Sequence, residues 1–200
     1  MEEYNRNYDH HFLRNGLNST IMVRAFLALE LSDEIRQALA SAQEILRQSP
    51  ARLTFVDPAL IHITVKFLGE VDEKIIPRII TAIREIPFEP FTVNAGIVTA
   101  NNRYRPRTVW SVIGDKGKGE LLAGKVEDAL EPLGFARETR KFTPHATVAR
   151  VKSFDPSLFR QLDLLKDRTY GDCIISGIKL KKSTLSGKGP VYEDLMEAAW

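Results

Sequence analysis

Hydrophobic residues recur along residues 22–195 with two spacings, and each spacing predicts one kind of element. Apolar side chains at alternate positions or in short unbroken runs are typical of β-strands, whereas recurrence every three or four positions is typical of α-helices. The predicted strands cover residues 22–29, 61–69, 91–95, 108–113, 142–151, 173–180 and 191–195. The predicted helices cover residues 32–48, 74–86, 120–133 and 156–165. Ser32 or Asp33 can cap the first helix, and Pro77 suits the second if it lies in the first turn.

The order of these elements repeats along the chain. Residues 22–95 and residues 108–180 both read strand, helix, strand, helix, strand, although they share little sequence. This repetition indicates a structural duplication. If the two halves pack about a pseudo-twofold axis, the strands predicted at residues 61–69 and 142–151 can face each other.

These two strands carry the same short motif. Each has a histidine two residues before a threonine, within Ile61-His62-Ile63-Thr64-Val65-Lys66-Phe67 and Pro144-His145-Ala146-Thr147-Val148-Ala149-Arg150. Because side chains alternate between the two faces of a strand, His62 and Thr64 share one face, as do His145 and Thr147. The other face of the first strand is predicted to hold Ile61, Ile63, Val65 and Phe67.

Two opposed histidines can act as a general base and a general acid near neutral pH. Phosphodiester hydrolysis suits such a pair, since one histidine removes a proton from water while the other protonates the departing alkoxide. The threonine hydroxyls can donate to the non-bridging phosphate oxygens. This scheme needs no metal ion and no other cofactor.

Other kinds of site find less support in the sequence. A single histidine of this type would most simply be a hydrogen-bonded group in a sheet, but the recurrence favours a shared function. Each strand supplies one histidine, and no acidic residue lies at a usual metal-ligand spacing. No Gly-x-Ser-x-Gly elbow occurs, and Cys173 lies in an apolar run, so a serine or cysteine nucleophile is not indicated.

Composition excludes several protein classes. The single cysteine rules out a disulfide framework, and no apolar run is long enough to span a bilayer. The N-terminus lacks the features of a signal peptide, so a cytoplasmic location is expected. Residues 1–21 are polar and are predicted to form a flexible tail ahead of one domain over residues 22–200. His10 and His11 in that tail are interpreted as solvated residues.

The net charge is only +2, but the basic residues form three groups. The groups comprise Arg103, Arg105 and Arg107; Arg137, Arg140 and Lys141; and Lys179, Lys181, Lys182 and Lys188. Such groups usually form a solvated surface, but they also suit a groove that follows phosphates. The charge alone does not decide between these possibilities.

With these residues in view, the chain resembles the 2H phosphoesterases, named for their paired His-x-Thr-x (HXTX) motifs, and most closely the RNA 2′,3′-cyclic phosphodiesterases once named 2′-5′ RNA ligases. The resemblance covers about residues 22–195. It rests on both histidine motifs with their flanks, on the opening strand Val23-Arg24-Ala25-Phe26, and on the closing segments at residues 180–185 and Gly189-Pro190-Val191-Tyr192-Glu193.

The resemblance implies an α+β fold with two pseudo-symmetric lobes, each an antiparallel sheet flanked by helices, and an active site in the cleft between them. It implies hydrolysis of an RNA 2′,3′-cyclic phosphate to a 2′-phosphate without metal or cofactor. By the same route, His62 would be the proton donor and His145 the proton acceptor. The residues implied to hold the phosphate are Thr64, Thr147 and Arg150. The implied partners are RNA ends that carry a cyclic phosphate, with tRNA fragments as one candidate, and a monomer is expected.

Two alternatives and two questions stay open at this point. The same site would also serve a 2′-5′ RNA ligase, or a module that binds RNA ends without turnover. Strict alternation from His145 places Arg150 on the opposite face, so a phosphate role for Arg150 needs a bulge, a twist or the strand end. Stacking on bases is a further possibility for Phe26, Phe67, Tyr104 and Trp110. Core packing is the expected role for Phe26 and Phe67.

Overall fold

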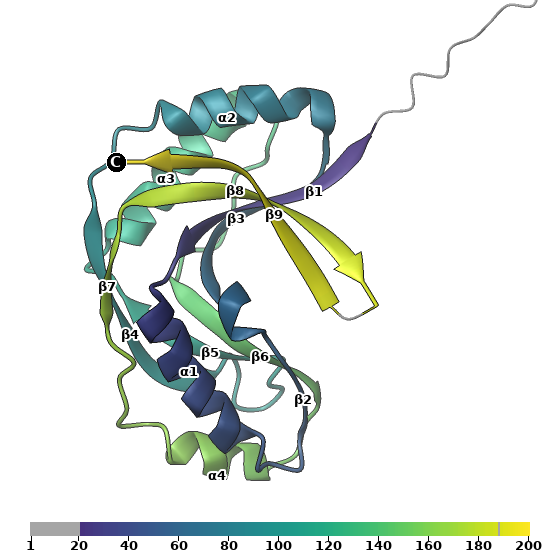
Figure 1. Ribbon diagram of the computed structural model, residues 1–200, viewed down its shortest axis with the longest axis vertical. Coiled ribbons are helices and arrows are strands. Elements are labelled where there is room, and N and C mark those ends of the chain that lie inside the picture. The colour runs from purple at the N-terminus through teal and green to yellow at the C-terminus, as the bar shows by residue number, and fades with distance from the viewer. Residues whose placement is uncertain (1–20, 188) are drawn as a thin grey trace, which may run out of the picture.

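The computed structural model of the protein describes residues 21–187 and 189–200, which form a curled antiparallel sheet with helices on its outer surfaces (Figure 1). The strands are β1 (Met22–Glu30), β2 (Arg52–Phe55), β3 (His62–Asp72), β4 (Phe91–Ala100), β5 (Thr108–Gly114), β6 (His145–Ser153), β7 (Asp172–Ile175), β8 (Gly177–Ser186) and β9 (Gly189–Ala199). The helices are α1 (Asp33–Leu46), α2 (Ile76–Arg84), α3 (Lys118–Leu130) and α4 (Ser157–Asp163). Short 3-10 turns are η1 (Pro58–Leu60), η2 (Glu73–Ile75) and η3 (Glu131–Leu133).

The sheet divides into two lobes at one narrow junction. The strand order is β7-β4-β5-β6-β3-β1-β8-β9, and β2 pairs with the remaining edge of β6. β3 and β6, the two histidine strands, are joined through the pairing of Ile63 with Ala146. We call β1, β3, β8 and β9 the first lobe and β2, β4, β5, β6 and β7 the second lobe. The predicted α+β fold with two antiparallel lobes is confirmed.

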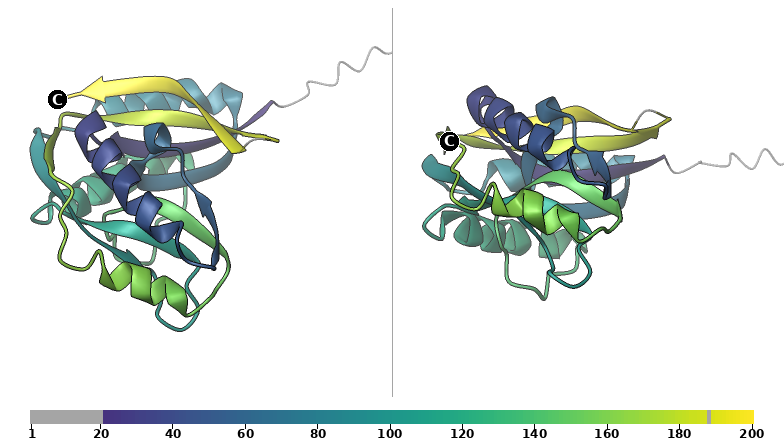
Figure 2. Two further views of the ribbon diagram at one scale, coloured as in Figure 1. Left: turned by 60° about the horizontal axis from the view of Figure 1, so that its bottom comes forward. Right: turned by 90° about the horizontal axis from the view of Figure 1, so that it is seen from below.

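The lobes exchange elements, so they are not the two halves of the sequence. Helix α1 follows β1 of the first lobe but contacts β6 and α4, whereas α3 follows β5 of the second lobe but contacts β3 and α2. Figures 1 and 2 show α1 and α3 on opposite sides of the molecule. Likewise β4 crosses to pair with β5, and β8 returns to pair with β1. The predicted duplication is therefore present in the order of elements, and each lobe draws on both halves.

Local signals place most element boundaries close to the prediction. The Ser32 hydroxyl accepts a hydrogen bond from the backbone N–H of Ile35 and caps α1, whose buried residues include Leu39 and Leu46 at helical spacing. Pro77 lies in the first turn of α2, where its missing N–H costs nothing. The predicted helix at 120–133 begins at Lys118, and its last turn tightens into η3, which ends at Gly134 with positive φ.

The prediction of one continuous strand over residues 173–180 was wrong. The segment is two strands that separate at Ser176, because β7 pairs with β4 in the second lobe while β8 pairs with β1 in the first. An unbroken apolar run cannot signal a change of partner. The last strand is also longer than predicted, since β9 pairs with β8 along its whole length. The second histidine strand begins at His145 rather than at residue 142.

A buried ion pair joins α3 to the first lobe. Lys66 of β3 has only 4% of its surface exposed, and its Nζ lies 2.8 and 2.7 Å from the two carboxylate oxygens of Glu127 on α3. The same ammonium donates to the backbone carbonyl of Ala136 at 2.9 Å. All three donor positions of the lysine are thus used, which offsets part of the cost of removing the charges from water.

The predicted tail, including His10 and His11, lies outside the described residues apart from Ile21. Within residues 21–187 and 189–200, none of the helices combines the length and the hydrophobicity that crossing a membrane would require.

Candidate active site

The register between β3 and β6 brings the two histidine motifs together. Ile63 pairs with Ala146, and continuing this antiparallel register places His62 beside Thr147 and Thr64 beside His145. Ile63 and Ala146 are buried, whereas the histidines and threonines are half-buried on the opposite face. One face of the lobe junction therefore presents two histidines and two hydroxyls in a diagonal arrangement.

Both imidazole rings are oriented by the same type of hydrogen bond. Nδ1 of His62 lies 2.7 Å from the carbonyl oxygen of Leu60, and Nδ1 of His145 lies 2.8 Å from that of Thr143. A carbonyl oxygen can only accept, so Nδ1 carries the hydrogen in each ring and Nε2 is the nitrogen that a neutral ring leaves free to accept a proton. Nε2 of His62 is 3.1 Å from the hydroxyl oxygen of Thr64. Each motif thus positions its own Nε2 atom through the residue two places earlier.

Aromatic rings pack against both histidines. Phe26 of β1 stacks on His62 with ring centroids 5.1 Å apart, and Tyr192 of β9 meets the same ring edge-on at 5.6 Å. Trp110 of β5 lies 4.3 Å from the ring of His145. Phe26 is buried as expected, but it packs against the rings around His62 rather than in the main hydrophobic core. These contacts restrict both imidazoles and shield part of the ring of His62 from water.

A network of charged side chains lies behind His62. Glu30 pairs with His62 in the β1–β3 register, and its carboxylate forms ion pairs with Arg36 of α1 and Lys181 of β8. Nε of Arg36 also donates to the carbonyl of Ile61 at 3.1 Å, next to the histidine. Lys181 reaches Asp194 of β9 at 2.6 Å. The network ties three strands and a helix to the start of β3.

Burial lowers the pKa of His62 from its ordinary 6.5 to about 4. Desolvation is the largest cause, and the nearby charges of Lys181, Arg36 and His145 act in the same direction. The carbonyl of Leu60, which accepts from Nδ1, opposes the shift. In the free protein, His62 is therefore a neutral imidazole at pH 7.

This shift predicts a specific loss of stability in mild acid. The folded pKa lies below the unfolded one, so the unfolded chain binds the proton more tightly between pH 6.5 and pH 4, and stability falls as pH falls through that window. We expect acidification from pH 7.5 to 4.5 to cost the wild type about 2 kcal/mol more than His62→Gln, measured by urea unfolding. Equal losses in the two proteins would contradict the assignment.

β3 and β6 each contain a β-bulge just after the histidine motif, at matching positions. The bulge determines which of the next side chains lies on the same face as the histidine. In β6 the pairing with β5 skips Val148, so Val148 and Ala149 both point inward and Arg150 emerges on the face of His145. In β3 the pairing with β1 skips Val65 in the same way, so Phe67 emerges on the face of His62.

The bulges answer one open question and overturn one prediction. Arg150 can reach the histidine face, although strict alternation places it elsewhere. Phe67 was predicted to lie with Ile63 and Val65 in the core, which was wrong. It is 65% exposed, and its ring lies 6.1 Å from that of Phe26. Phe67 and Arg150 occupy equivalent positions in the two motifs.

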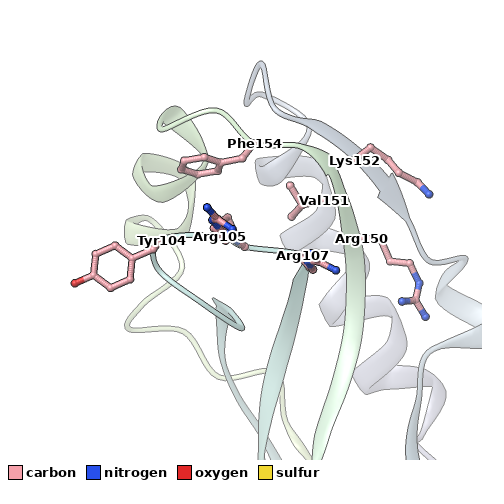
Figure 3. A pocket seen from close by; sticks show the side chains of 8 residues that line it. Tyr104, Arg105, Arg107, Arg150, Val151, Lys152 and Phe154 are labelled. Atoms are coloured by element: carbon pink, nitrogen blue, oxygen red, sulfur yellow. The ribbon is translucent and has the colours of Figure 1, made fainter.

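A hollow of about 510 Å³ adjoins the histidine face rather than covering it (Figure 3). It is lined by Tyr104, Arg105, Pro106 and Arg107 of the β4–β5 loop and by Arg150, Val151, Lys152 and Phe154 at the end of β6. Arg150 belongs to both regions, since its strand position follows Thr147 on the histidine face. The histidines themselves lie at the lobe junction and do not line this hollow.

The family model of LigT-like phosphoesterases matches residues 29–110 and 116–192, a span that includes both histidine motifs. The chain belongs to the LigT-like phosphoesterase family. Its relatives include the RNA 2′,3′-cyclic phosphodiesterase of Archaeoglobus fulgidus, which is 36% identical over 178 residues that cover 86% of this chain and 98% of the relative. The protein of the same name from Methanocaldococcus jannaschii is 33% identical over 88% of this chain and 99% of its own.

Solved structures share the LigT-like fold. A protein from Thermus thermophilus superposes with a TM-score of 0.75 at 26% identity, covering 88% of this chain and 97% of its own. Escherichia coli LigT, crystallised with 3′-AMP, superposes with a TM-score of 0.73 at 21% identity, covering 90% of this chain and 98% of its own. The superpositions extend over both lobes, so the whole two-lobed fold is common to these proteins.

Several residues around this LigT-like site were not identified by sequence reasoning. Glu30, Arg36 and Asp194 had no assigned role, and Tyr192 was noted only as part of a closing segment. They come from separate elements, and nothing in their local spacing links them to the histidines. Among the residues that the structure describes, no three His, Cys, Asp or Glu side chains gather in a way that would hold a metal ion.

Proposed function

We propose that this protein hydrolyses RNA 2′,3′-cyclic phosphate ends to 2′-phosphates by general acid and base catalysis. The observation that carries the proposal is the β3–β6 register, which supports a site with two Nε2 atoms and two threonine hydroxyls on one face. Membership in the LigT-like family and the printed names of its relatives support the same substrate class.

In the proposed reaction, Nε2 of His145 takes a proton from water as the water oxygen attacks phosphorus. The bond between phosphorus and O3′ breaks, and His62 gives a proton from Nε2 to the departing O3′. The products are a 2′-phosphate and a free 3′-hydroxyl. The acid and the base exchange states in the turnover, so a proton transfer between solvent and the site restores them.

The role of His62 as the acid requires protonation once substrate is bound. Its low pKa in the free protein reflects burial and the surrounding cations. A bound cyclic phosphate carries a negative charge, which favours the imidazolium form and opposes the repulsion from Lys181 and Arg36. Substrate binding is thus proposed to raise the pKa of His62, so that the ring is protonated and can act as the acid.

The threonines and Arg150 are proposed to hold the phosphate. Thr64 and Thr147 flank the two histidines and can donate to the non-bridging oxygens, which gain charge in the transition state. Arg150 follows on the same face after the bulge and adds a permanent positive charge. Phe26 and Tyr192 build the wall around His62, so their proposed contribution is to keep that ring dry and oriented.

The test is incubation with a short RNA that ends in a 2′,3′-cyclic phosphate, followed by identification of the phosphate isomer. We expect a 2′-phosphate, undiminished activity in the presence of EDTA, and a bell-shaped dependence of kcat/KM on pH. A 3′-phosphate product would reverse the assignment of the leaving oxygen. Complete loss of activity with EDTA, restored by a metal ion, would contradict the proposed mechanism.

Three further proposals concern the RNA substrate, the oligomeric state and the location of the protein. The substrate is expected to be single-stranded at its 3′ end, with tRNA fragments as one candidate. A monomer is expected because both histidine motifs come from one chain. A cytoplasmic location stays a prediction from the sequence.

A further inference from the structure

In two of the three basic groups, most of the side chains that the structure describes form ion pairs with carboxylates, and Lys188 lies outside the described residues. The ion pairs are those of Arg137 with Asp128 and Glu131, Lys141 with Glu120, Lys179 with Asp194 and Glu197, Lys181 with Glu30 and Asp194, and Lys182 with Glu193. Because their charges are balanced locally, these groups create little net positive potential.

The third basic group is different. Arg105 and Arg107 of the β4–β5 loop lie with Arg150 and Lys152 of β6 around the hollow described above. Within the described part of the chain, none of these side chains forms an ion pair with a carboxylate, and no Asp or Glu lines the hollow. Cations gathered without counter-ions favour an anionic ligand.

The loop that carries Arg105 and Arg107 is shaped before any ligand binds. The side-chain oxygen of Asn102 accepts from the backbone N–H groups of Tyr104 and Arg105, and that of Asn101 accepts from those of Arg107 and Thr108. These bonds hold the turn in one conformation. The basic side chains are therefore presented by a preorganised loop, which lowers the entropy cost of binding.

Two exposed aromatic side chains lie at one end of the hollow. Tyr104 is 90% exposed, and Phe154 is 40% exposed with its ring against Phe159. Figure 3 shows the lining side chains spread from Tyr104 and Phe154 at one end to Arg150 and Lys152 at the other. Unpaired cations beside exposed aromatic rings are typical of surfaces that bind single-stranded nucleic acid through phosphates and stacked bases.

The hollow begins a short distance beyond the proposed site along β6. A cyclic phosphate occupies the 3′ end of an RNA, so the chain can continue only through the nucleotides on its 5′ side. Arg150 is three residues beyond Thr147 and Lys152 is five, which correspond to about 10 and 16 Å along a strand.

We propose that this hollow binds the nucleotides that precede the cyclic phosphate end, with Arg105, Arg107 and Lys152 on their phosphates and Tyr104 stacked on a base. Arg150 would contact the RNA at the boundary with the catalytic face. The inference rests on the proposed function for the identity of the bound end, and it adds a reason for preferring RNA strands over mononucleotides.

The experiment compares two substrates in a triple variant, Tyr104→Ala with Arg105→Ala and Lys152→Ala. One substrate is a nucleoside 2′,3′-cyclic phosphate, and the other is a hexanucleotide that ends in the same cyclic nucleotide. We expect kcat/KM for the hexanucleotide to fall about 10- to 100-fold, mainly through KM. The mononucleotide should be hydrolysed about as fast as by the wild type, because Tyr104, Arg105 and Lys152 lie outside the catalytic face.

Salt dependence gives a second readout. Loss of two phosphate contacts should make the plot of log(kcat/KM) for the hexanucleotide against log[salt] shallower by about 1.4. The matched control is Arg78→Ala with Arg84→Ala on the exposed surface of α2, which removes the same charge from the first lobe. The control should leave both substrates and the salt slope unchanged.

Failure of this inference is distinguishable from failure of the proposed function. Unchanged hexanucleotide kinetics in the triple variant, or an equal loss with both substrates, would overturn the RNA-binding hollow. If the wild type hydrolysed neither substrate, the proposed function would fail. Fluorescence anisotropy with a hexanucleotide 3′-phosphate would then still decide the inference, which requires weaker binding by the triple variant than by the control.

Discussion

Replacing either histidine by alanine is expected to reduce hydrolysis of a cyclic-phosphate RNA by at least about 10²- to 10⁴-fold. Each ring supplies one Nε2 atom to the shared face, and no other titratable side chain pairs with the opposite motif in the β3–β6 register of the described chain. His62→Ala with His145→Ala should be little worse than the poorer single variant, because an acid and a base that act in one step are not additive. The measurement is kcat/KM with the short RNA substrate.

Two further readouts separate lost catalysis from lost structure. Each alanine variant should still unfold cooperatively and should bind the cyclic-phosphate RNA with affinity similar to the wild type. The pH profile of each variant's residual activity should lack one limb of the bell, since one titrating group has been removed. Wild-type activity in either variant would refute the two-histidine mechanism.

The largest effect on stability is expected from breaking the buried ion pair between β3 and α3. Lys66→Ala leaves the carboxylate of Glu127, whose side chain is 13% exposed, without its partner, and it also removes the donor to Ala136. Loss of one member of a buried pair is expected to lower the free energy of unfolding by about 3–5 kcal/mol. Urea unfolding of the variant and the wild type at pH 7 measures this difference in the free energy of unfolding.

A double variant and a surface control make this prediction sharper. Lys66→Met with Glu127→Leu removes both charges and keeps apolar volume, so it should recover most of the stability lost in Lys66→Ala. Lys141→Ala breaks the exposed pair with Glu120 and should change stability by less than about 1 kcal/mol. If Lys66→Ala behaved like Lys141→Ala, the pair would not be buried in solution.

The ion pair also bears on the site through the bulge in β3. Lys66 follows the skipped residue of the bulge and turns inward to Glu127, so that the next residue, Phe67, emerges on the histidine face. The equivalent residue in β6 is Ala149, followed by Arg150. The residue after the bulge is therefore a lysine in an ion pair in the first motif and a small buried alanine in the second.

The sequence by itself determined which residues are proposed to carry the chemistry and what kind of elements hold them. The His-x-Thr spacing requires a shared strand face, and the apolar spacing distinguishes strands from helices, because both depend on residues close together in the chain. For the same reason Ser32 as a helix cap and Pro77 in a first turn could be predicted. The two bulges have no local signature here. The prediction that Phe67 lies in the core was therefore wrong, and the face of Arg150 stayed undecided.

Only the tertiary structure decided how these parts combine. The exchange of α1 and α3 between lobes, the change of partner at Ser176, and the gathering of Glu30, Arg36 and Tyr192 around His62 depend on contacts between distant segments. The structure also decided which basic group lacks neighbouring carboxylates, since Lys181 meets Glu30 and Asp194 while Arg105 meets no carboxylate among the described residues. Whether a charge is balanced depends on which side chains are close in space, and the order of residues along the chain does not give these contacts.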